Sequence, residues 1–122
     1  MDGPIRDFRD LIIWRKSLAF AKEIYNLTRL LPRDEQFGLV SQLRRAAISV
    51  SSNIAEGHAR QGREFRRFLS IARGSLAEAV SQLLLAVELG FLTPESIMAA
   101  EQSASEIRRM AAALSRNLPS DP

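Results

Sequence analysis

Cysteine is absent from the 122-residue sequence, and histidine, tryptophan and tyrosine occur once each. Without cysteine the chain has neither a disulfide framework nor a thiolate metal site. No apolar run approaches the ~18 residues of a membrane span, and residues 1–10 are too charged to resemble a signal peptide. We therefore expect a cytoplasmic protein without membrane contact. The five prolines lie outside the long periodic segments, which favours long helices over strands.

Apolar residues recur at spacings of three and four residues in four segments, which is the pattern of amphipathic helices. The predicted helices span residues 8–31, 35–57, 63–89 and 94–117. Short loops between helices of similar length favour antiparallel packing of neighbours. The sequence therefore predicts an all-α protein, an antiparallel up-down-up-down four-helix bundle that occupies residues 1–122 as one domain.

Local signals place the ends of these helices. Pro32 ends the first helix, and Asp34 is a candidate N-cap for the second because its carboxylate can accept from the free amides of the first turn. Gly57 lies where the apolar stripe of the second helix stops, so we expect a loop over residues 57–62. Thr93 and Pro94 form a favourable opening for the fourth helix.

The outward faces of the second and third helices carry few charges, whereas a solvated helix face usually carries many. Monomers seldom display continuous uncharged patches, so we predict a homo-oligomer that buries these faces against copies of itself. In the alternative interpretation the helical phase is wrong by about 40° and these residues complete the bundle's own core. The predicted interface comprises Gln42, Arg45, Ile48, Ser49, Ser52, Asn53, Ala55, Glu56, Ile71, Gly74 and Leu85.

Positive charge is concentrated in one segment. The formal net charge is +3, and fifteen of the seventeen basic residues are arginine, whose planar guanidinium binds phosphate through two donors at once. Five arginines and one glutamate lie between residues 57 and 74. This surplus predicts sequence-nonspecific binding of RNA or DNA through the phosphate backbone. An acidic protein partner, or plain solvation of the surface, remains an alternative. The candidate ligands of phosphate are Arg44, Arg60, Arg63, Arg66, Arg67 and Arg73.

Catalytic chemistry has little support in the sequence. The single histidine, His58, lies beside Gly57, and no strand-turn-helix elbow surrounds Ser51 or Ser52. No phosphate-binding glycine loop and no zinc or di-iron spacing is present. We expect no enzymatic activity, catalytic residue, metal, cofactor or small-molecule substrate. An enzyme that uses Glu56 and His58 is the remaining alternative, and it requires both side chains in one pocket.

The run SQLRRAAISVSSNIAEG, from Ser41 to Gly57, resembles the four-helix bundle family named for the 23S rRNA intervening sequence. Asn53 to Gly57 is the specific part, whereas Ser51 and Phe37 stand where proline and tyrosine are frequent. The resemblance implies a bacterial protein, encoded inside ribosomal RNA intervening sequences or by free-standing genes, that forms a homopentameric ring without established enzymatic activity. The sequence also looks distantly similar to the accessory protein of diversity-generating retroelements, which implies a partnership with nucleic acid.

Overall fold

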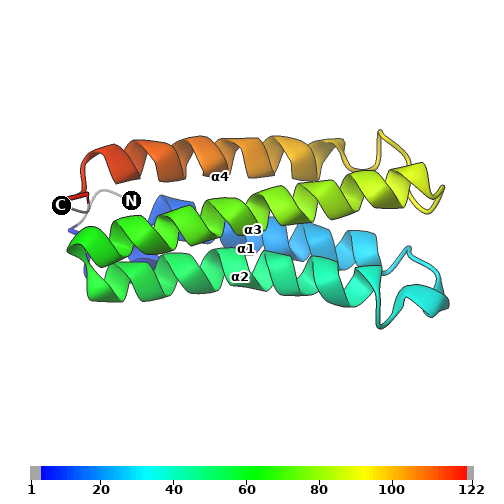
Figure 1. Cartoon of the computed structure of the whole chain (residues 1–122), viewed down its shortest axis with the longest axis horizontal. Coiled ribbons are helices and arrows are strands. Elements are labelled where there is room, and N and C mark those ends of the chain that lie inside the picture. The colour runs from blue at the N-terminus through cyan, green and yellow to red at the C-terminus, as the bar shows by residue number, and fades with distance from the viewer. Residues whose placement is uncertain (1–3, 121–122) are drawn as a thin grey trace.

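The computed structural model describes residues 4–120 and contains four long helices (Figure 1). Successive helices run antiparallel, each contacts its sequence neighbours, and α4 also contacts α1. The predicted all-α, up-down-up-down four-helix bundle is therefore confirmed. The elements are η1 (Phe8–Asp10), α1 (Ile12–Thr28), η2 (Arg33–Glu35), α2 (Leu39–Arg60), α3 (Gly62–Glu88) and α4 (Met98–Arg116).

The core lies along the bundle axis and is built from the predicted apolar stripes. Each fully buried Leu, Ile or Phe side chain contributes about 1.5–3 kcal/mol of transfer free energy. Leu18 belongs to a lateral stripe of α1 and remains 41% exposed. The largest fully buried apolar side chains are Phe20, Ile13, Ile24, Leu43, Ile54, Leu69, Leu76, Leu83, Ile97, Ile107 and Val50.

The first helix is shorter than the predicted range 8–31. Asp7 accepts a hydrogen bond from the Arg9 amide at 2.8 Å, which caps the 3-10 turn η1. Leu11 is extended, with ψ of 127°, so α1 begins at Ile12. Aspartate side chains that bond to nearby amides compete with helix formation, and this competition separates η1 from α1.

The second helix begins later than predicted, and the predicted Asp34 cap is wrong. Residues 33–35 form η2, and Gly38 precedes α2 with φ of −111° and ψ of −109°. Glu35 Oε1 accepts from the Leu39 amide at 3.2 Å and takes the role predicted for Asp34. Because α2 begins only after Gly38, the carboxylate that reaches its first turn is that of Glu35, one residue after Asp34.

The predicted loop over residues 57–62 is also wrong, because α2 continues to Arg60 and a single residue, Gln61, connects it to α3. Gly57 is buried inside α2, where a Cβ atom would lie 2.7 Å from Phe68 Cβ and 3.0 Å from Phe65 Cδ1. Glycine is required here for close packing of two helices, whereas the sequence pattern indicated a helix end. The turn is made by Gln61 and Gly62, with φ of 62° and 58°.

The start of the fourth helix is partly as predicted. Thr93 Oγ1 accepts from the Ser96 amide, and Ser96 Oγ accepts from the Thr93 amide, each at 3.1 Å. This reciprocal pair is a capping box. Between this capping box and α4 the chain forms turns in which a backbone amide donates to the carbonyl three residues earlier. Met98 N, for example, donates to Glu95 O at 3.3 Å. The α-helix therefore begins at Met98 instead of residue 94.

By length and composition alone α3 could cross a membrane, because an 18-residue stretch of this helix has a mean hydropathy of 1.2. A core helix of a globular protein can have the same length and hydropathy, and 39% of this stretch is buried inside the bundle. The buried side chains of α3 face its neighbours α2 and α4, with which it shares extensive contacts. We interpret the apolar content of α3 as that of a core helix.

Candidate nucleic-acid and subunit interfaces

Two of the predicted phosphate ligands, Arg60 and Arg67, are held by carboxylates at the junction of α2 and α3. Arg60 lies 2.9 Å from Glu56 and 3.6 Å from Glu64. Arg67 Nε donates to Glu64 Oε2 at 2.9 Å. Both guanidinium groups also lie over the ring of Phe68, 5.3 Å and 4.8 Å from its centroid. These ion pairs neutralise part of the charge predicted for this end of the bundle.

Glu64 is the carboxylate that joins these two arginines. Its hydrogen bond from Arg67 lowers its pKa from the usual value of 4.5, and the charges of Arg67, Arg60 and Arg63 lower the pKa further. Glu64 is therefore ionised at neutral pH. Because the group is exposed to solvent, the pairing positions the arginine side chains more than it stabilises the fold.

Arg66 is a structural side chain of the bundle. Its Nη1 donates to the carbonyl oxygens of Ser115 at 2.9 Å and Leu118 at 3.0 Å. Ser115 lies in the last turn of α4 and Leu118 just beyond it, where the carbonyls at the negative end of the helix dipole attract a cation. Arg66, a predicted phosphate ligand, thus links α3 to the end of α4 by hydrogen bonds, and part of its side chain remains exposed to solvent.

The remaining members of the predicted cluster are exposed. Arg63 and Arg73 make no hydrogen bond or ion pair within residues 4–120. Arg63, Arg66, Arg67 and Ser70 line a hollow of about 230 Å³ together with Pro119. Three guanidinium groups and a hydroxyl around one small hollow form a suitable environment for an oxyanion.

Arg44 is separated from this cluster. Its Nε donates to Thr28 Oγ1 at 2.9 Å, and its guanidinium stacks on Tyr25 at 4.4 Å. Arg44 and Arg60 are sixteen residues apart on α2, which is about 24 Å of helix. Arg44 therefore joins α1 to α2, and the structure does not bring it together with the other predicted ligands.

The predicted subunit interface includes apolar side chains that point away from the core. Ile48 is 47% exposed, Ile71 40% and Leu85 48%. Ser52 and Gly74 are also exposed, and Ala55 is half-buried. The alternative interpretation, in which a 40° phase error places these residues in the core, is therefore wrong for the exposed members.

The polar residues of the predicted interface on α2 are divided between the bundle and the surface. Ser49 Oγ and Ser75 Oγ are hydrogen-bonded at 2.8 Å, and Asn53 Nδ2 donates to Ser49 O at 2.7 Å and to its hydroxyl at 2.9 Å. Ser49 and Asn53 thus belong largely to the contact between α2 and α3. Gln42 and Arg45 remain exposed beside a hollow of about 190 Å³.

Glu56 and His58 do not form a joint site. Residues two apart on a helix point in different directions. Glu56 pairs with Arg60, whereas the His58 ring packs edge-on against Phe65, with 5.6 Å between centroids. Within residues 4–120 no group of three or more His, Cys, Asp or Glu side chains could hold a metal ion.

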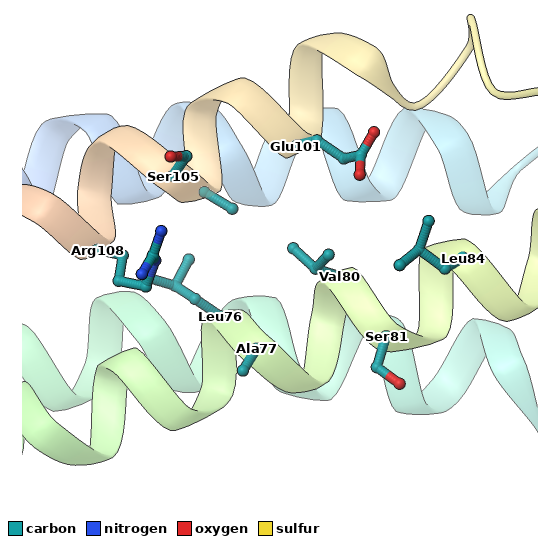
Figure 2. Close-up of a pocket in the computed structure, with 9 residues that line it drawn as sticks. Leu76, Ala77, Val80, Ser81, Leu84, Glu101, Ser105 and Arg108 are labelled. Carbon is teal, nitrogen blue, oxygen red and sulfur yellow. The ribbon is translucent and has the colours of Figure 1, made fainter.

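Sequence reasoning missed an apolar groove between α3 and α4, shown in Figure 2. Its volume is about 550 Å³. Leu76, Val80 and Leu84 reach toward α4, while Glu101 and Arg108 extend from α4 at opposite ends. The groove is formed by the lateral faces of α3 and α4, each of which is only partly apolar. The sequence therefore shows no continuous apolar stripe that would predict it. Ala77, Ser81, Ala104 and Ser105 complete the lining.

A basic stripe on α1 was also missed. Arg15 and Lys22 on α1 and Arg29 at its C-cap are exposed at intervals of seven residues, so they lie on one side of this helix. Beside them Leu18 and Tyr25 line a hollow of about 560 Å³ that also includes Lys22 and Arg29. The seven-residue spacing of basic side chains was the available signal.

Comparison with known proteins identifies the family of this chain. Residues 9–113 match the family model described as 23S rRNA-intervening sequence protein. The chain belongs to this family. A solved structure of a protein of unknown function from the S23 ribosomal protein family of Bacteroides thetaiotaomicron is 27% identical, covers 86% of this chain and 99% of its own, and has a TM-score of 0.78. No curated protein is significantly similar.

Membership of the 23S rRNA-intervening sequence protein family confirms the resemblance carried by residues 41–57. The match extends from η1 into α4 and so covers all four helices of the bundle. The family description and the solved relative name no ligand or reaction. The pentameric ring and the nucleic-acid partner that the resemblance implies remain predictions.

Proposed function

We propose that the protein is a self-associating helical bundle without enzymatic activity that binds RNA or DNA through backbone phosphates. The observation that carries the proposal is the hollow that Arg63, Arg66 and Arg67 line together with Ser70. Guanidinium groups bind phosphate oxygens through charge-assisted hydrogen bonds and do not read base sequence there. Self-association into a ring would repeat this hollow and add several weak contacts into useful avidity.

Binding is tested by fluorescence anisotropy with labelled single-stranded RNA and DNA at ~50 mM salt. The variants Arg63→Glu and Arg73→Glu change exposed side chains that hold nothing in the fold. We expect weaker binding and, for each lost phosphate contact, a logarithmic salt slope that is smaller by about 0.7. Arg33→Glu, at the other end of the bundle, is the matched control. Absence of binding, or equal losses in the control, contradicts the proposal.

Self-association is tested separately by light scattering. Ser52→Arg and Ala55→Glu place a charge among the small side chains of the outer face of α2, where an unpaired charge in a close contact is strongly unfavourable. We expect both variants to lose mass relative to the wild-type assembly while keeping their helical circular dichroism. A wild-type protein of monomeric mass contradicts this part of the proposal.

A protein-interaction scaffold is the second candidate. Two observations favour it: Arg60 and Arg67 are already paired with carboxylates, and the α3–α4 groove is mainly apolar. Partner capture that persists after nuclease treatment, together with no anisotropy change on adding RNA or DNA, would favour the scaffold over nucleic-acid binding.

A further inference from the structure

A closed ring of identical subunits joins two different faces of each subunit, because the contact runs head to tail. The proposed self-association supplies one face, the outer side of α2. We propose that the second face is the α3–α4 groove, and that this groove receives α2 of a neighbouring copy. The inference rests on the proposed self-association and names the two surfaces that meet.

The groove offers an apolar floor between two opposite charges. Leu76 and Val80 form part of the floor, and Leu84 is one of its exposed apolar side chains. Glu101 and Arg108 are seven residues apart on α4, about 10.5 Å along the helix. Within residues 4–120 neither side chain takes part in a hydrogen bond or an ion pair. Figure 2 shows them at the two ends of the groove.

The outer face of α2 has the complementary form. Ile48 protrudes from the helix, and the neighbouring Ser52 and Ala55 are small enough to allow close approach of another helix. Arg45, seven residues before Ser52, is exposed and makes no ion pair within the described residues 4–120. A basic side chain, a protruding apolar side chain and a hydroxyl therefore follow one another along this face.

The level of each residue along the bundle axis follows from contacts inside one subunit. The hydrogen bond between Ser49 and Ser75 sets α2 against α3, which places Ile48 level with Leu76 on the antiparallel helix. Leu76 and Arg108 line the same end of the groove. Two subunits that lie side by side and point the same way therefore present Ile48 of one at the level of the groove of the other.

The charges select the register of this contact. In such a pair α2 of one subunit runs parallel to α4 of the next, because both helices run in the same direction within the bundle. A shift of about one helical turn, roughly 6 Å, brings Arg45 beside Glu101. A ring with this shift closes only when each bundle is tilted against the ring axis, as the strands of a closed barrel are. Since the two spacings of seven residues are equal, the same shift brings Ser52 beside Arg108. A second copy of this chain thus supplies an opposite charge to Glu101 and a hydroxyl acceptor to Arg108.

Charge reversal tests the pairing. Arg45→Glu and Glu101→Arg each place like charges together, so we expect the assembly to weaken by about tenfold or more in dissociation constant. The combined variant, Arg45→Glu with Glu101→Arg, restores opposite charges, and we expect it to recover the wild-type mass in sedimentation and native mass spectrometry. Arg33→Glu and Glu95→Arg are the matched controls outside the contact, and they retain the wild-type mass.

Disulfide cross-linking tests the geometry of the contact. Because the chain has no native cysteine, only the introduced thiols can form disulfides. The variant Ile48→Cys with Ser105→Cys carries one thiol on each of the proposed faces, at nearly the same level in the proposed register. Under mild oxidation we expect a ladder of disulfide-linked copies on a non-reducing gel, whereas each single variant yields dimers at most. Ile48→Cys with Ser70→Cys is the control pair, because Ser70 lies outside the groove.

The outcomes separate this inference from the proposed function. A monomeric wild-type protein overturns both. An assembled wild-type protein whose mass is unchanged in Glu101→Arg, or whose mass is not recovered in the combined variant, overturns the inference alone and leaves the proposed self-association in place. It would also indicate that the groove serves another occupant. Rescue by the combined variant together with the cross-linked ladder supports the inference.

Discussion

The contact between α2 and α3 and the contact between α3 and α4 differ in how closely the helices approach. At the first, a buried glycine and small polar side chains bring the helices together over much of their length. At the second, larger side chains leave a groove of about 550 Å³ on the surface. The same helix, α3, therefore has one side closed within the chain and one side open.

This difference separates residues that hold the fold from residues available to a partner. Substitutions in the close contact should change the free energy of unfolding of the isolated chain. Substitutions of exposed groove residues, such as Leu84 and Arg108, should change assembly with little effect on that free energy, since exposed positions usually contribute less than about 0.5 kcal/mol. The following predictions test the separation, beginning with the largest expected effect.

Gly57→Ala should be the most damaging small substitution in the close contact. The added methyl group would lie 2.7 Å from Phe68 Cβ, and overpacking of this kind costs about 1–3 kcal/mol. Gly74→Ala is the control, because no atom lies within 4 Å of its added Cβ and alanine favours an exposed helix by about 0.5–1 kcal/mol. Urea unfolding measures both, and equal effects would contradict the close packing at Gly57.

Ser49→Ala should destabilise the protein by about 1–2 kcal/mol, because it leaves the buried Ser75 hydroxyl without its bond across the two helices. The double variant, Ser49→Ala with Ser75→Ala, removes both partners and should recover part of that loss. A double-mutant cycle in urea measures the coupling. Strictly additive effects would show that the two hydroxyls do not interact.

Gln61→Gly should stabilise the protein by about 1 kcal/mol. Gln61 has φ of 62° and ψ of 176°, a backbone region that costs a residue with a side chain on the order of 1–3 kcal/mol. Glycine relieves this strain, although it also increases the freedom of the unfolded chain. Thermal unfolding measures the gain. A lower melting temperature would show that the turn is unstrained.

The smallest effect concerns the pH dependence of the junction. Because the pKa of Glu64 is lowered in the folded state, its contribution is present above the unfolded value of 4.5 and is lost as pH falls through the lowered folded value. Arg67→Ala should move the pKa of Glu64 upward toward 4.5, as measured by carboxyl NMR titration. An unchanged pKa would show that Arg67 does not bond to Glu64 in solution.

The helices and their core stripes could be predicted because burial imposes a periodic pattern on each helix. Leu39, Leu43, Val50 and Ile54 on α2 all lie in the core as their spacing predicts. Gly57 could not be interpreted in the same way, since a glycine that ends a helix and a glycine that admits a neighbouring helix look alike locally. The difference lies in Phe65 and Phe68, on another helix.

The candidate sites were harder to predict because their partners are distant in sequence. Arg66 bonds to carbonyls about 50 residues further along, so nothing in its own segment distinguishes it from Arg63. The groove likewise combines the lateral faces of two helices. The exposure of Ile48 and Ile71 was predictable from helical phase alone, because it depends only on which side of each helix the core occupies.

The single-residue connection at Gln61 has a consequence for the order in which the chain folds. Closing a loop of minimal length costs little chain entropy, and the contact it brings together begins with residues adjacent in sequence. We expect the hairpin of α2 and α3 to dominate the folding transition state, with φ-values there higher than those of α1 and α4. The terminal helices would then dock on a template that is already half the bundle.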